Sequence, residues 1–71
     1  MPLPMVAPAG LQPTPAERRV LSELRRGKSN GSIATTLAIS RRTVECHLSR
    51  LLSKTGCRNR TQLLLWSMTE R

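Results

Sequence analysis

Helix-capping signals constrain the fold of this chain more than any other feature of its sequence. The run Thr14-Pro-Ala-Glu17 places a hydroxyl at a helix N-cap, a proline in the first turn and a carboxylate that can reach back to the cap. The run Asn59-Arg-Thr-Gln62 repeats this spacing, and Gly27 and Gly56 are natural helix stops. Because two further starts are expected after Ser29 and at Ser40, the signals predict four short helices and an all-α fold.

Apolar residues recur at three- and four-residue steps within each predicted helix, so each helix has one inward face. The third helix, expected at about 41–55, follows the short turn 38–40 and has the longest stripe. The expected inward residues are Val20, Leu21 and Leu24, then Ile33, Ala34 and Leu37, then Val44, Leu48, Leu51, Leu52 and Thr55, and finally part of the set Leu63, Leu64, Leu65, Trp66 and Met68.

The chain is strongly basic, and its length limits it to one small domain. Its 71 residues carry 12 Lys and Arg against 4 Asp and Glu, a formal net charge of +8. This balance favours a polyanionic partner, either a nucleic acid or an anionic membrane surface. With Trp66 as the single aromatic residue, there is no set of rings on which unpaired bases could stack, so duplex DNA is favoured over single-stranded RNA.

Residues 1–13 are rich in proline and carry no charge, which predicts a flexible leader or linker ahead of a domain at 14–71. This segment is either a disordered leader or the tail of a tether from an upstream sensing domain. The leader and the domain together give the expected architecture, a compact four-helix helix-turn-helix unit with a disordered N-terminal leader.

Several other classes of function are disfavoured by what the sequence offers. Cys46, Cys57 and a lone His47 are too few for a metal site, so both cysteines are expected as free thiols and neither a metal nor a cofactor is expected. The sequence has no paired carboxylates, no activated nucleophile and no phosphate-binding glycine loop, so an enzyme is not expected. No apolar run is long enough to span a bilayer, and a reducing cytoplasm is the expected location.

The outer face of the third predicted helix has the character of a groove-reading surface. A rotation of about 100° per residue places Arg42, Cys46, Ser49 and Ser53 opposite the inward stripe, with Glu45 at the edge. One flank carries Thr43, His47, Arg50 and Lys54. Small polar side chains can approach base edges while flanking cations neutralise phosphates, as insertion into a major groove requires.

Residues 11–68 resemble the C-terminal DNA-binding domain of LuxR-type regulators. The stretches that carry the resemblance are Leu11 to Leu21, Gly27-Lys-Ser-Asn30, Ile33-Ala34, Ile39-Ser40, Thr43-Val44 with His47, and Arg58-Asn-Arg-Thr61. The resemblance implies a third helix in the major groove, a second helix that supports it and a fourth that often pairs with a second copy. It also implies an upstream receiver or ligand-binding domain in most relatives.

The resemblance also assigns roles to individual residues. Those expected to face bases are Glu45, Cys46 and Ser49, and those expected at the DNA backbone or groove edge are Ser40, Arg41, Arg42, Thr43, His47, Arg50 and Lys54. Two departures stand out. Gly31-Ser32 replaces a common Lys-Glu pair and removes half of a capping box, and Glu45 stands where a cation is frequent.

The expected partners are double-stranded DNA with an inverted-repeat operator, RNA polymerase, and a second copy of the chain. Leu64, Leu65 and Met68 are expected in a weak two-fold contact. The leading hypothesis is therefore a bacterial transcription regulator associated with the nucleoid. The alternatives are a sigma-factor-like region, against which the leucine-rich fourth helix argues, and a protein-interaction module such as an anti-activator that uses that helix.

Overall fold

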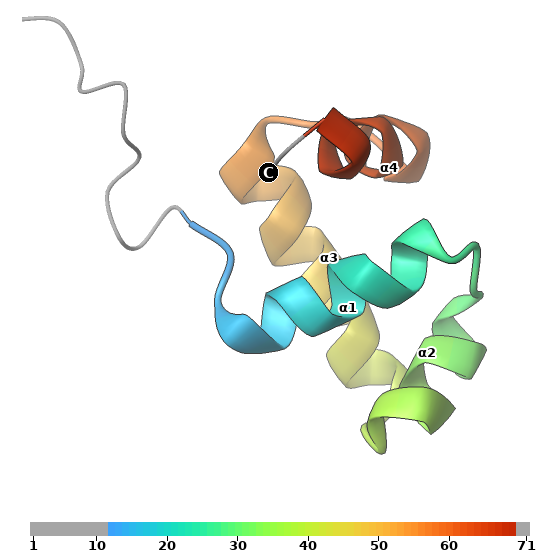
Figure 1. Ribbon diagram of the computed structural model, residues 1–71. Coiled ribbons are helices and arrows are strands. Elements are labelled where there is room, and N and C mark those ends of the chain that lie inside the picture. Colours follow the sequence, from blue (N-terminus) through green and yellow to red (C-terminus); the bar gives the residue numbers. More distant parts are fainter. Residues whose placement is uncertain (1–11, 70–71) are drawn as a thin grey trace, which may run out of the picture.

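A computed structural model describes residues 12–69, which fold into four helices without a strand in that range. These are α1 (Pro15–Arg25), α2 (Asn30–Leu37), α3 (Arg41–Thr55) and α4 (Arg60–Thr69), arranged as in Figure 1. The predicted all-α fold is confirmed, and the third helix has the predicted bounds. Most of the predicted leader, residues 1–11, lies outside the described residues.

The caps form largely as the sequence predicts. The Glu17 amide donates to Thr14 Oγ1 at 3.1 Å and the Thr14 amide donates to Glu17 Oε1 at 3.0 Å, a complete capping box. At α4 the Gln62 amide donates to Asn59 Oδ1 at 2.8 Å. The Gln62 side chain, however, accepts from the Arg58 amide at 2.8 Å, whereas a capping box would use the amide of the next residue, Asn59. The result is a related but shifted cap.

Helix α2 begins with half a capping box. The Ser29 side chain accepts from the Ser32 amide at 3.2 Å, and serine at position 32 has no carboxylate with which to return the bond. The helix ends at Ala38, whose φ of +57° is left-handed. This conformation costs a residue with a Cβ about 1–2 kcal/mol, and it makes the tight turn from α2 into α3.

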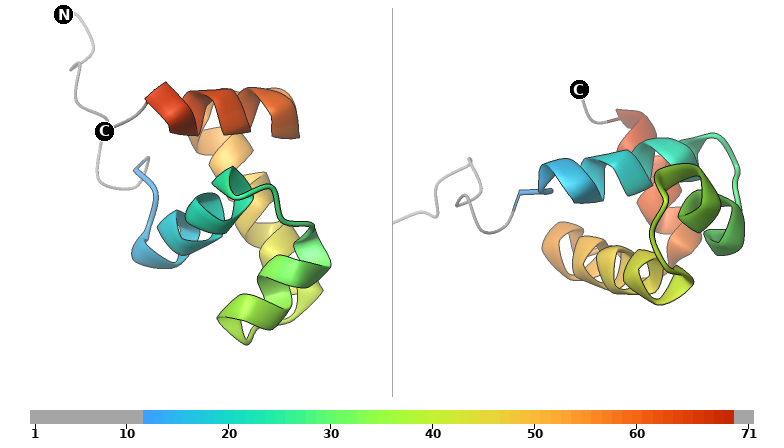
Figure 2. Two further views of the ribbon diagram at one scale, coloured as in Figure 1. Left: turned by 45° about the vertical axis from the view of Figure 1, so that its right-hand side comes forward. Right: turned by 90° about the horizontal axis from the view of Figure 1, so that it is seen from below.

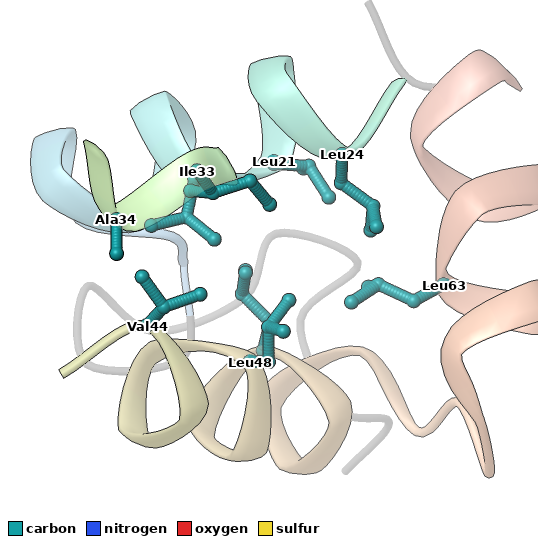
Figure 3. Close-up of a cluster of buried hydrophobic side chains, with 9 residues drawn as sticks. Leu21, Leu24, Ile33, Ala34, Val44, Leu48 and Leu63 are labelled. Carbon is teal, nitrogen blue, oxygen red and sulfur yellow. The ribbon is translucent and has the colours of Figure 1, made fainter. Parts of the chain in front are cut away.

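One apolar core holds the helices together. Figure 3 shows side chains of α1 and α2 pointing across the core toward Val44 and Leu48 of α3, while Leu63 of α4 enters from the end. The fully buried apolar members are Val20, Ile33, Val44, Leu51 and Leu63. Ile39, Cys57 and Trp66 pack partly buried against this cluster.

The arrangement leaves one side of α3 uncovered by the other helices. Helices α1 and α3 lie on opposite sides of the core, as the view from below in Figure 2 shows most clearly. Since α3 buries only its inward stripe, its outer face is free to meet a partner.

Candidate nucleic-acid interface

The outer face of α3 presents small polar side chains in successive turns. Glu45, Cys46 and Ser49 are all exposed, as are Arg42 and Ser53. None of these residues is bulky enough to keep the helix from the floor of a groove, apart from Arg42 in the first turn. The three residues expected to face bases therefore share one accessible surface of the helix.

The N-terminus of α3 is organised by two hydroxyl groups. Ser40 Oγ accepts from the Thr43 amide at 3.0 Å, and the two hydroxyl oxygens lie 2.8 Å apart. This end of a helix carries partial positive charge and favours an approaching phosphate. Arg41 follows directly and lies against α2, since its Nε would be 3.8 Å from a Cβ at Gly31. Ser40, Thr43 and Arg41 are thus gathered at one end of the exposed face.

Farther along α3, His47 and Arg50 are presented differently. Arg50 is exposed, whereas His47 is half-buried and its Nδ1 is buried without a hydrogen-bond partner among residues 12–69. Since Nδ1 is buried, Nε2 is the ring nitrogen left to meet an external group. The geometry suits a single hydrogen bond from His47 at the groove edge.

Lys54 is engaged inside the domain, which differs from its expected place on the outer flank. Its Nζ lies 2.6 Å from Glu17 Oε1 and also donates to the Gln12 carbonyl at 3.2 Å. The Lys54 side chain is 14% exposed and that of Glu17 only 1%. Sequence reasoning assigned Glu17 to the cap of α1 alone and missed this ion pair.

The Glu17 carboxyl has a pKa below its usual value despite its burial. Burial raises the pKa, but the hydrogen bond from Lys54, the Thr14 amide and the positive charges of Lys54 and His47 together lower it further than burial raises it. The carboxylate therefore stays ionised at neutral pH, and it fixes the last turn of α3 to the first turn of α1.

Arg60 makes a second long-range connection that the sequence did not reveal. Its Nη1 donates to Asn30 Oδ1 at 2.6 Å and its Nη2 donates to the Lys28 carbonyl at 2.7 Å. These bonds join the start of α4 to the start of α2. Asn30 and Arg60 lie in stretches that carry the family resemblance, but nothing in their spacing indicates that they meet.

The charge on α3 is left largely uncompensated. Among the carboxylates at positions 12–69, Glu17 pairs with Lys54 and Glu23 pairs with Lys28 at 2.7 Å, while Glu45 forms no ion pair. Arg41, Arg42 and Arg50 likewise have no ion-pair partner within that range. Free cations beside a small polar face are what binding to a phosphate backbone requires.

The described part of the chain lacks two other kinds of feature. Residues 12–69 contain no group of three or more His, Cys, Asp or Glu side chains placed to hold a metal ion. None of the described helices has the length and apolar character needed to cross a membrane.

Residues 13–67 match the family described as bacterial regulatory proteins, luxR family. The chain is 44% identical over 54 residues to the CsgBAC operon transcriptional regulatory protein of Escherichia coli (strain K12), covering 76% of this chain and 25% of that protein. It is 46% identical over 57 residues to the uncharacterized transcriptional regulatory protein YhcZ of Bacillus subtilis (strain 168), covering 80% of this chain and 27% of that protein.

A third relative is the response regulator Rre1 of Synechocystis sp. (strain PCC 6803). It is 40% identical over 62 residues, which cover 87% of this chain and 27% of the relative. The chain thus spans about a quarter of the length of the curated relatives that it matches. With the family match covering most of the chain and the helix-turn-helix geometry of α2 and α3, the chain belongs to the LuxR family of bacterial regulatory proteins and is a DNA-binding domain of that family.

Proposed function

We propose that this chain binds duplex DNA sequence-selectively, with α3 in the major groove, as the DNA-contacting part of a transcription regulator. Glu45, Cys46 and Ser49 face the bases. Cationic and hydroxyl side chains hold the phosphates and groove edges: Ser40, Arg41, Arg42, Thr43, His47 and Arg50. Lys54 is left out of this set because its ammonium is bound to Glu17.

The single observation that supports this proposal best is the exposed, uncompensated outer face of α3. Glu45 forms no ion pair within residues 12–69, although Arg41 and Arg42 precede it by four and three residues on the same helix. In a major groove, an ionised carboxylate accepts best from the exocyclic amine of cytosine. We therefore assign Glu45 to the reading of one cytosine.

The proposed assembly is a weak dimer on an inverted-repeat operator. Leu65 and Met68 of α4 are 58% and 57% exposed, and both are available to a second copy. Leu64 packs partly against the core, so it contributes less to such a contact. The names of the relatives support a role in bacterial transcription regulation. The cytoplasm as the location and RNA polymerase as a further partner are part of the same proposal.

Selection from a pool of random duplexes tests the proposal. The parent protein should enrich an inverted repeat that has one strongly preferred cytosine in each half-site. The Glu45→Ala variant should relax that one position by about 1–3 kcal/mol and leave the others unchanged. The matched control is Arg26→Ala at the C-cap of α1, which removes an exposed charge outside α3 and should select the parent's sequence.

Two outcomes would contradict the assignment. If the parent protein enriches no sequence, its binding to DNA is not selective. If Glu45→Ala tightens binding equally to all duplexes, Glu45 is only a repulsive charge near the phosphates and reads no base.

A further inference from the structure

Helices α1 and α4 line a second surface feature, to which α3 contributes no lining residue. It is a cavity of about 250 Å³ with Leu21 and Trp66 among its lining residues and with Arg18 and Arg25 at its edge. We propose that this surface, here called the α1–α4 cavity, docks an acidic segment of a partner protein that inserts one apolar side chain. The inference goes beyond the proposed function because it concerns a different face and a different class of partner.

The two arginines are placed as a pair. Arg18 and Arg25 are both exposed and seven residues apart, so they stand about two turns or 10 Å apart on the same flank of α1. The nearest acidic residues along the helix, Glu17 and Glu23, are already paired with Lys54 and Lys28. Neither arginine has an ion-pair partner among residues 12–69, although Arg18 Nε donates to the Pro13 carbonyl at 3.3 Å.

The floor of the cavity is apolar. Leu21 belongs to the core, Trp66 packs against it, and the hydroxyl of the buried Ser67 is satisfied by the Leu64 carbonyl at 2.7 Å. The volume is sufficient for one leucine or aromatic side chain, since a cavity of about 150 Å³ can hold benzene. An apolar floor between two guanidinium groups favours a partner segment that carries an apolar side chain between two carboxylates.

A DNA duplex bound at α3 does not fit this surface. Helix α1 lies across the core from α3 (Figure 3), and the residues that line the cavity come from α1, α4 and Pro13, with none from α3. A phosphate backbone also has no apolar side chain for Leu21 and Trp66 to bury. Arginine binds planar carboxylates through two parallel hydrogen bonds, which favours Asp and Glu of a protein segment.

The chain carries its own reporter for this proposal. Trp66 is its single aromatic residue, so the intrinsic fluorescence of the 71-residue protein arises at the cavity. The probe is a blocked ten-residue peptide of Asp, Glu and Ser with one central Leu. Titration should change the emission of Trp66 and reach saturation. Two control peptides, one with Ser for Leu and one with Asn and Gln for the acids, should each bind more weakly.

Paired variants separate docking at the cavity from general attraction between opposite charges. Arg18→Gln with Arg25→Gln should weaken binding of the peptide about three- to tenfold, as loss of two exposed carboxylate pairs implies. Arg19→Gln with Arg26→Gln removes the same charge from α1 outside the cavity lining and should change affinity less than twofold. Circular dichroism checks that both variants keep the helical fold of the parent.

A competition experiment keeps this inference distinct from the proposed function. A saturating duplex selected by the parent protein should leave peptide affinity unchanged, because the two surfaces are separate. A peptide titration that does not saturate, equal weakening by both variant pairs, or displacement of the peptide by the duplex would each overturn the proposal. If no duplex is selected but the peptide result holds, the proposed function fails and the docking surface stands.

Discussion

Lys54 in the last turn of α3 forms an ion pair with Glu17 in the first turn of α1, at 2.6 Å between Nζ and Oε1. The same Glu17 oxygen accepts from the Thr14 amide at the N-cap. One buried carboxylate therefore completes the cap of α1 and fixes the end of the helix that we place in the major groove. The pair adds a polar connection between α1 and α3 to the apolar core that packs them together.

Replacing Lys54 by Met should destabilise the domain by about 3 kcal/mol or more, because it leaves the carboxylate of Glu17 buried without a counter-charge. Urea unfolding followed by circular dichroism measures the change in the free energy of unfolding. Lys28→Met is the control, since the side chains of Lys28 and Glu23 are 29% and 14% exposed, against 14% and 1% for Lys54 and Glu17, and loss of the more exposed pair should cost much less. Equal losses in the two variants would show that Glu17 and Lys54 are not a special pair.

Stability should also fall in acid through Glu17. Its pKa is lower in the folded chain than its ordinary value of 4.5, so the unfolded state takes up a proton first as the pH falls. The contribution of the pair is fully present above that ordinary value and is lost as the pH drops through the lower folded pKa. Unfolding in urea from about pH 6 to pH 3 should show this loss in the parent and a shallower slope in Glu17→Gln.

Phosphate contacts should be visible in the salt dependence of DNA binding. Arg42→Ala and Arg50→Ala should each weaken binding to all sequences and reduce the slope of log K against log salt by about one. Under conditions in which the variant is folded, Lys54→Met should leave that slope unchanged, because the ammonium of Lys54 in the parent protein is held by Glu17. Slopes equal to the parent's in Arg42→Ala and Arg50→Ala would remove these residues from the phosphate contacts.

The helices were predictable from the sequence because their signals are local. The cap at Thr14, the stop at Gly56 and the stripe from Val44 to Leu51 each depend on residues within a few turns. The position of Lys54 in the last turn of α3 was predictable, but its engagement by Glu17 inside the domain was not. Its partner Glu17 is 37 residues away, and no spacing rule connects them.

In the candidate site, too, the features set by local signals were predictable and the long-range contacts were not. The exposure of Glu45, Cys46 and Ser49 follows from their place opposite the apolar stripe, which periodicity gives directly. The bonds from Arg60 to Asn30 and to the Lys28 carbonyl depend on how α4 crosses the start of α2. Such crossings are set by packing of the whole core, so a single sequence does not reveal them.

If two copies pair through α4, the affinity for DNA should depend on the presence of the second half-site. The double variant Leu65→Ser with Met68→Ser should bind an inverted repeat about tenfold more weakly, because two exposed apolar side chains no longer bury area between copies. Its affinity for a duplex with one half-site should match that of the parent. Electrophoretic mobility shifts on both duplexes measure the difference. Equal affinities of parent and variant for the inverted repeat would place the copies' contact elsewhere.

Chemical footprinting with dimethyl sulfate tests most directly whether α3 enters the major groove. The reagent methylates guanine N7 in the major groove and adenine N3 in the minor groove, so protection identifies the groove that the protein occupies. On the selected duplex, we predict protection of guanine N7 in two clusters about one helical turn apart, with adenine N3 left reactive. Protection of adenine N3 with guanine N7 fully reactive would contradict the major-groove placement of α3.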